Sequence, residues 1–241
     1  HSWLSLDGGS WESSLNWDSG LPGSVFDALD TVQLVQDWAV AGSWTLDADV
    51  SLNRFVYEDT GASGDVGGTL SGVSGESLTF GGTDPAVEVR SGVFTLNVPV
   101  SSAQGLTKVG GGAVTLAQPS PGLVGTLTVT NPGATNAGGV YISDAGAVAG
   151  LTTVVTEGTP TQGGFFRLAG AGITLPATLG FELSGQGGNS APNGTLVGSG
   201  AGFNVVAGPI SLRTNGVRLS NVGASRTDFT GVITQDFSPG G

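Results

Sequence analysis

The sequence predicts an all-β protein whose short strands stack as the coils of one parallel β-helix, also called a β-solenoid. Many short runs alternate apolar and hydroxyl side chains, and each run ends at glycine, asparagine, aspartate or proline, as strands between tight turns do. A brief phrase also recurs, in the forms G-G-T-L-S-G, G-V-F-T-L-N, G-G-A-V-T-L and G-T-L-T-V-T, which is typical of stacked repeats. No segment has the apolar spacing of an amphipathic helix. A β-sandwich or a barrel would share the short strands but would give no reason for the phrase to recur.

The N-terminal part has a different composition from the rest, because it holds all five tryptophans: Trp3, Trp11, Trp17, Trp38 and Trp44. Large flat side chains can close the end of a stacked-strand core, which otherwise exposes apolar surface and unpaired strand edges. We therefore expect residues 1–45 to form a Trp-rich cap and first coil, and residues 46–241 to form the remaining coils of one continuous domain. A platform on which carbohydrate stacks and ordinary core packing are the alternatives for these tryptophans.

From Thr45 onward, strand-like runs follow one another with a turn signal after each. The expected strands are 45–46, 50–52, 55–57, 69–70, 77–80, 87–89, 93–98, 113–116, 126–130, 140–142, 154–155, 165–168, 173–175, 178–183, 195–197, 203–205, 210–213, 217–219 and 232–233. In a parallel coil each strand bonds to the equivalent strand of the next coil about 4.8 Å away, and the turns between them can vary in length.

Bulk composition excludes several classes of function. The chain has 44 glycines, no cysteine and no methionine, and a net charge of −12. An acidic surface repels phosphate backbones and anionic lipid, so we expect no nucleic-acid binding, and no apolar run is long enough for membrane insertion. Because the sequence starts at His1 without methionine, we expect a processed protein that is extracellular or attached to a bacterial cell surface.

The sequence holds little catalytic chemistry. His1 is the only histidine, so a Ser-His-Asp triad would have to use this terminal residue, and a two-histidine copper site cannot form. We expect no catalytic residue and no cofactor. The densest acidic patch lies within residues 47–65. Alternation puts Asp47 and Asp49 on one face of a strand, where they are weak candidates for calcium binding; a solvated acidic face is the simpler interpretation.

One segment resembles a known family. Residues 106–130 resemble the autotransporter-associated β-strand repeat, also called the passenger-associated transport repeat. The residues that match the first half of the repeat are Leu106, Lys108, Gly110, Gly112, Val114, Thr115 and Leu116. Those that can be aligned with its second half are Gly122, Gly125 and Thr126. The sequence Q-P-S-P at 118–121 replaces the usual asparagine and tyrosine. The resemblance implies a right-handed parallel β-helix that is secreted or displayed on bacteria, and it does not imply an enzyme.

We therefore expect a non-enzymatic structural β-solenoid, such as a surface fibre or adhesin module. Its specific form is a homopolymer in which basic residues of the last coils dock head-to-tail on the Trp-rich, acidic end of another copy. The expected interface residues are Trp3, Trp11, Trp17, Arg213, Arg218 and Arg226. A β-helix that binds or cleaves extracellular polysaccharide through residues 47–65, and a passenger fragment of a larger autotransporter, are the alternatives.

Overall fold

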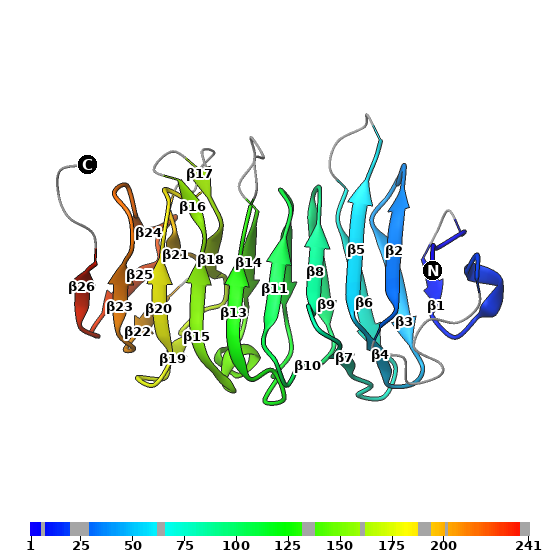
Figure 1. Cartoon of the computed structure of the whole chain (residues 1–241), viewed down its shortest axis with the longest axis horizontal. Helices are drawn as coiled ribbons and strands as arrows, with labels where there is room; N and C mark the ends of the chain where they lie inside the picture. Colours follow the sequence, from blue (N-terminus) through cyan, green and yellow to red (C-terminus); the bar gives the residue numbers. More distant parts are fainter. Residues whose placement is uncertain are drawn as a thin grey trace.

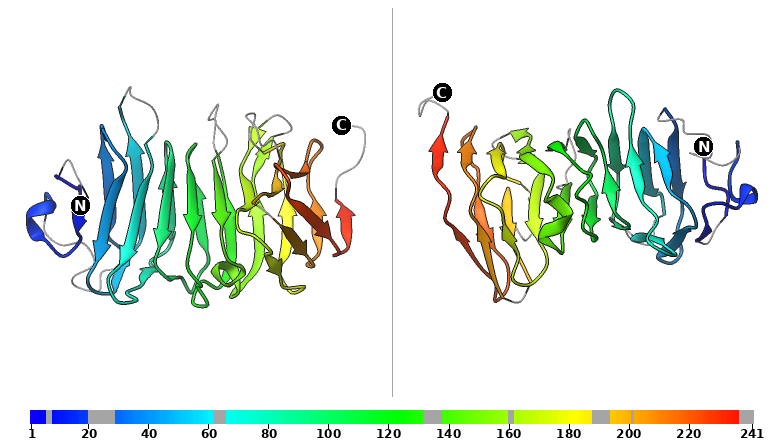
Figure 2. Two further views of the ribbon diagram at one scale, coloured as in Figure 1. Left: turned by 180° about the vertical axis from the view of Figure 1, so that it is seen from behind. Right: turned by 90° about the horizontal axis from the view of Figure 1, so that it is seen from below.

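The structure is a computed structural model that describes residues 1–5, 8–19, 29–61, 66–131, 138–159, 162–187, 194–200 and 202–236. The chain winds as a β-solenoid, so that its first strand, β1, and its last, β26, lie at opposite ends of an elongated body (Figure 1). Views from behind and from below show the same continuous order of coils from the first strands to the last (Figure 2). The predicted all-β solenoid is thereby confirmed.

Two long parallel sheets run the length of the body, each with nine strands. The first long sheet contains, in spatial order, β2 (Thr31–Gln36), β5 (Arg54–Asp59), β8 (Ala86–Val89), β11 (Leu106–Val109), β13 (Gly125–Val129), β15 (Leu151–Thr156), β20 (Gly180–Leu183), β23 (Ile210–Leu212) and β26 (Ile233–Gln235). The second contains β1 (Gly9–Ser10), β3 (Gly42–Leu46), β6 (Gly68–Gly72), β9 (Val93–Asn97), β12 (Ala113–Leu116), β14 (Gly139–Ile142), β18 (Phe165–Leu168), β21 (Leu196–Gly198) and β24 (Leu219–Asn221).

Shorter parallel sheets form the third side of the coils. One contains β4 (Val50–Leu52), β7 (Leu78–Phe80) and β10 (Val100–Ser101), and the other contains β19 (Thr174–Leu175), β22 (Phe203–Val206) and β25 (Arg226–Phe229). An antiparallel pair, β16 (Gly158–Thr159) with β17 (Gln162–Gly163), lies in a turn between two coils. The helical segments among the described residues are two short 3-10 helices, η1 (Ser14–Asn16) and η2 (Ala145–Val148).

Coil length varies because the turns absorb insertions while the strands keep their register. Val87 pairs with Lys108 and Lys108 with Val129, so two successive coils take 21 residues each. Phe55 pairs with Val87 in the coil before, which takes 32 residues. This variation explains why the recurring phrase is recognisable in the sequence but has no fixed period.

One apolar core fills the interior from the cap to the last coils. It forms because alternate residues of each strand point inward and stack above their equivalents in the next coil. The column Leu106, Leu127, Val154, Phe181 and Ile210 is an example, in which each residue pairs with the next and all are buried. The long sheets cross the expected boundary at residues 45 and 46 without a break.

Several strands differ from the sequence prediction. The runs at 31–36 and 106–109 were not expected as strands, yet β2 and β11 belong to the first long sheet. The strand expected at 217–219 begins two residues later, as β24. In each case pairing with a neighbouring coil decides the bounds, and a local pattern of apolar residues does not contain that information.

Candidate functional site

The tryptophan end is the first candidate, and its aromatic side chains form the closed end of the core. Trp3, Trp11 and Trp17 are only 3%, 1% and 4% exposed. The Trp17 ring packs edge-on at centroid distances of 4.9 Å from Trp3 and 4.8 Å from Trp11, and Trp3 in turn reaches Trp44 at 6.2 Å. We expected these three side chains to anchor a second copy, but the chain's own packing uses them. A docking surface at this end must therefore come from other residues.

Hydrogen bonds fix this cap to the first coils. Trp17 Nε1 donates to the carbonyl oxygen of Trp11 at 2.8 Å, and Gln36 Nε2 donates to that of Trp3 at 2.7 Å. The Glu12 carboxylate accepts from the backbone N–H groups of Asp47 and Ala48 at 2.9 and 3.1 Å. The N-terminal segment thus covers strands β2 and β3 instead of leaving their apolar end open.

The three arginines expected at the C-terminal interface are exposed. Two of them pair with acidic groups of the same chain, Arg213 with Glu182 at 2.9 Å and with Asp236, and Arg226 with Asp228 at 3.0 Å. Arg218 lies directly before β24, and its carbonyl oxygen accepts from the backbone of Thr195. The first two arginines are therefore less available for an acidic partner than their formal charges suggest.

In the part of the chain that the structure describes, the C-terminal end of the solenoid has no cap like the one that covers the N-terminal end. Strands β26, β24 and β25 are the last members of their three sheets, and within the described residues no strand lies beyond them. Val232 and Ile233 are 71% and 45% exposed. Half-buried apolar side chains that contact the last part of the core are Leu212, Val217, Leu219 and Phe229. The outermost strands of parallel sheets, beside exposed apolar side chains, are suited to receive further strands.

The acidic candidates Asp47 and Asp49 do not lie on one face of a strand, as expected, but in the turn between β3 and β4, and they serve different contacts. Asp47 accepts from the hydroxyl of Ser10 at 2.6 Å, whereas Asp49 accepts from the backbone N–H and the hydroxyl of Ser77 at 2.8 and 2.9 Å. These donors lower the pKa of the Asp49 carboxyl, and slight burial opposes them. Each carboxylate therefore binds a residue of a neighbouring coil.

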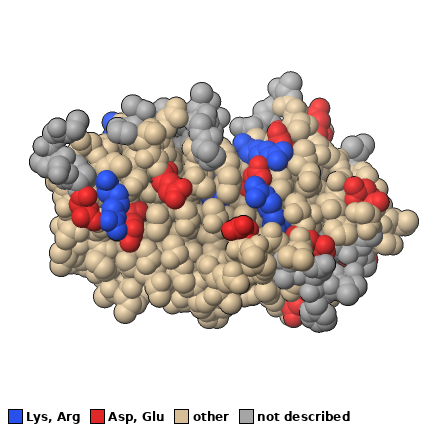
Figure 3. All heavy atoms as spheres, viewed as in Figure 1, with Lys and Arg blue, Asp and Glu red and all other residues tan. Residues whose placement is uncertain are grey.

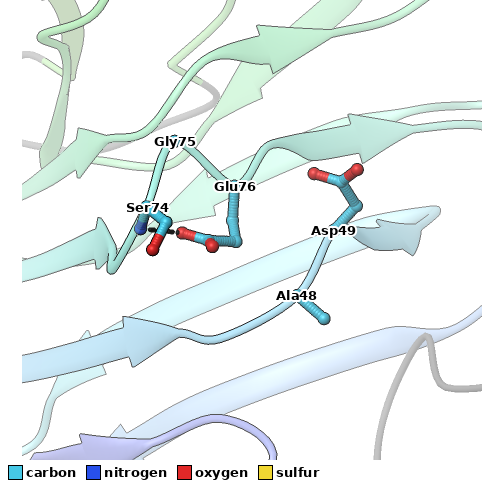
Figure 4. A pocket seen from close by; sticks show the side chains of 5 residues that line it. All are labelled: Ala48, Asp49, Ser74, Gly75 and Glu76. Atoms are coloured by element: carbon cyan, nitrogen blue, oxygen red, sulfur yellow. Dashed lines mark hydrogen bonds between the residues drawn. The ribbon is translucent and has the colours of Figure 1, made fainter.

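An open pocket of about 300 Å³ lies beside Asp49, and Figure 4 shows its lining. The Glu76 carboxylate turns back to accept from the backbone of Ser74 at 2.6 Å, while the Asp49 carboxylate points away from it (Figure 4). Among the residues that the structure describes, no group of three histidine, cysteine or acidic side chains is placed to hold a metal ion. A calcium site would need the Asp47 and Asp49 carboxylates to converge, whereas here they accept hydrogen bonds from different coils.

Lys108 has an unusual environment that the sequence did not predict, since there it was only one match to the repeat motif. Its side chain is fully buried in the first long sheet, and Nζ donates to the carbonyl oxygens of Gly110, at 2.5 Å, and Gly112. Burial lowers the pKa of this amine to about 7, and the negative charge of Glu88 opposes the shift. An amine enclosed in this way cannot reach a substrate, so its role is structural. Alternation from buried Leu106 could have indicated that Lys108 points inward.

Charged side chains on the outer face of the first long sheet pair with one another. Arg54 and Arg90 both contact Glu88, at 2.5 Å, and Arg90 also contacts Glu58 at 2.8 Å. Figure 3 shows two groups of basic atoms beside acidic ones on this face, with mostly uncharged surface around them. These pairs link neighbouring coils without forming a catalytic arrangement.

Comparison with known proteins gives one informative similarity. The chain is 29% identical over 138 residues to the adhesin BmaC autotransporter of Brucella suis biovar 1 (strain 1330). The aligned segment covers 52% of this chain and 4% of that protein. The chain therefore corresponds to a small part of the relative's length. No family model matches the chain, and no solved structure matches it. Within the described residues, no helix has the length and apolar character needed to cross a membrane.

Proposed function

We propose that this chain is a non-enzymatic, structural β-solenoid segment of an autotransporter-type adhesin, located at the bacterial cell surface or secreted. The observation that carries the proposal is the single core that continues through nine strands of both long sheets, because a continuous core makes the segment a stiff rod. The similarity to an autotransporter adhesin supports the same role. Resemblance of residues 106–130 to the passenger repeat is a further argument for this class.

A shape measurement combined with an activity screen tests this role. Small-angle scattering of the purified chain should give an elongated particle, and incubation with a panel of polysaccharides, with and without calcium, should release no new reducing or unsaturated ends. Cleavage that disappears in Asp47→Asn or Asp49→Asn would instead support the polysaccharide-cleaving alternative. Because these carboxylates accept hydrogen bonds from neighbouring coils, each variant is checked for an unchanged melting temperature.

A second proposal, end-to-end self-association, is favoured by the open C-terminal end. There the edges of β26, β24 and β25 lie together with exposed Val232 and Ile233. We infer that this end docks on the acidic N-terminal end of another copy, where β1 is the first strand of the second long sheet. Backbone pairing at that strand and C-terminal apolar contacts would take the place of tryptophan anchors.

Val232→Lys tests this association, and Val73→Lys is its matched control, because Val73 is 62% exposed but lies far from the last coil. A charge at a strand edge opposes pairing. Electron microscopy and sedimentation should show filaments for the unsubstituted chain and for Val73→Lys, and shorter species for Val232→Lys. A chain that stays monomeric at high concentration rejects the association but leaves the structural role intact.

A further inference from the structure

The outer face of the first long sheet has a hollow of about 150 Å³ near its C-terminal end. Thr153, Gly180 and Pro209 come from successive coils, and Gly180 takes the outward position between the other two. Phe181 and Ile210, whose side chains are buried in the core, contribute only backbone to the floor. The hollow exists because the central position of this outward row has no side chain.

Nothing in the local geometry requires glycine at position 180. Its φ does not lie in the left-handed region, where glycine is favoured. A Cβ placed there would come no closer than 3.7 Å to Thr152 O and 3.8 Å to Pro209 Cγ, which are ordinary contacts. Glycine within a strand also weakens it relative to residues with side chains. The missing side chain therefore leaves usable space without being needed for the fold.

The lining combines an apolar floor with polar walls. Glu182 lies at one edge, 41% exposed at its side chain, and its carboxylate pairs with Arg213 at 2.9 Å. The hydroxyl-bearing residues Thr153, Ser211 and Thr234 complete the walls. Arg213 pairs with both Glu182 and Asp236, so these three groups keep one net negative charge and the hollow disfavours an anion. The hydroxyls, the carboxylate and the guanidinium still offer both donors and acceptors.

We propose that this hollow is a binding subsite for one ring of a neutral saccharide. A sugar ring has C–H faces that fit the backbone of Gly180 and the ring of Pro209, and hydroxyl edges that fit Glu182 and Ser211. The volume holds about five water molecules, which one ring would displace, and a longer glycan would extend along the sheet face. The subsite deepens the proposed adhesin role. It rests on that role in one respect, namely that an adhesin meets glycans outside the cell.

Saturation-transfer NMR with the methyl glycosides of glucose, galactose, mannose and N-acetylglucosamine tests the subsite directly. We expect at least one to bind with a dissociation constant on the order of 1 mM, since single rings offer few atoms to contact. Gly180→Val, which fills the hollow with a residue suited to strands, should weaken binding about tenfold or more, as should Glu182→Gln. Thr128→Val, on the same sheet face but outside the hollow, should bind like the unsubstituted chain.

Melting curves of the variants keep the test independent of folding, because Gly180→Val should melt at or above the temperature of the unsubstituted chain. Absence of binding by all four glycosides at 20-fold the expected constant, roughly 20 mM, overturns the proposal. Binding that Gly180→Val leaves unchanged also overturns it. Either result leaves the rod shape and the lack of polysaccharide cleavage unaffected, so failure of the subsite is distinguishable from failure of the structural role.

Discussion

Lys108 donates from inside the core to the carbonyl oxygen of Gly110, with Nζ and O 2.5 Å apart. The same amine donates to Gly112, and φ of Gly110 is +93°, a left-handed conformation that glycine adopts readily. The lysine therefore caps the turn through which β11 of the first long sheet continues into β12 of the second. A single side chain stabilises the corner between the two sheets.

Truncation of this side chain should destabilise the coil. Lys108→Ala removes the donor for two carbonyl oxygens and leaves a cavity in the core, and we expect the free energy of unfolding to fall by about 3 kcal/mol or more. Thr107→Ala, on the outer side of the same strand, should cost less than about 1 kcal/mol. Urea denaturation followed by circular dichroism measures both. Equal losses in the two variants would contradict a capping role for Lys108.

The buried amine should also make stability depend on pH. Its pKa is lowered from 10.5 to about 7 in the folded chain, so between these values the unfolded state binds a proton that the folded state lacks. Stability therefore rises as the pH increases across this window, by at most about 1.4 kcal/mol per unit. The difference in unfolding free energy between the unsubstituted chain and Lys108→Met should grow by about 2 kcal/mol from pH 7 to pH 9. A difference that stays constant over this range would show that the amine does not change its protonation on folding.

The sequence was informative where one face of a strand is buried and the other is solvated. Ala113–Leu116 was predicted with the bounds that β12 has, because glycine before it and alternation within it are local signals. Strand β11 was missed because a lysine stands at an inward position, and only the carbonyls of the following turn explain how that lysine can be buried.

The candidate site was less predictable, since contacts between coils decide it. The sequence favoured a closed cap at the tryptophan-rich end over an exposed platform. Which tryptophans pack together there, such as Trp3 against Trp17, depends on contacts that no local pattern contains. The hollow at Gly180 is formed by four successive coils, so its residues are far apart in the sequence.

Asp59 provides a second test of the turns. Its buried carboxylate accepts from the backbone N–H groups of Trp38, Gly61 and Val66 at 3.2, 3.0 and 2.8 Å. Burial raises its pKa, but these three donors outweigh burial and hold the pKa below its ordinary value. Asp59→Asn should therefore lower the free energy of unfolding by about 1–3 kcal/mol at neutral pH.

Hydrogen exchange should locate that loss. Amides of Trp38, Gly61 and Val66 should exchange faster in Asp59→Asn, while Asp84→Asn, at an exposed turn position, should leave them unchanged. The stability from Asp59 is present above the ordinary carboxyl pKa and is lost as the pH falls through the lower folded pKa. The two proteins should thus become equally stable in strong acid, and a gap that persists there would point to a cause other than the carboxylate charge.

The last prediction concerns the cap. Trp17 contacts Trp3 and Trp11 and donates to the carbonyl oxygen of Trp11, so Trp17→Ala should cost about 3–5 kcal/mol locally. Leu15→Ala is the control, because Leu15 is 87% exposed in the same segment. Limited proteolysis should cut Trp17→Ala within residues 1–19 and leave the later coils intact, since each coil is stabilised mainly by its neighbours. Loss of the cap also exposes strand edges of the first coils, so sedimentation should detect more association for Trp17→Ala than for Leu15→Ala. If both variants resist proteolysis equally, the tryptophans do not close this end of the solenoid.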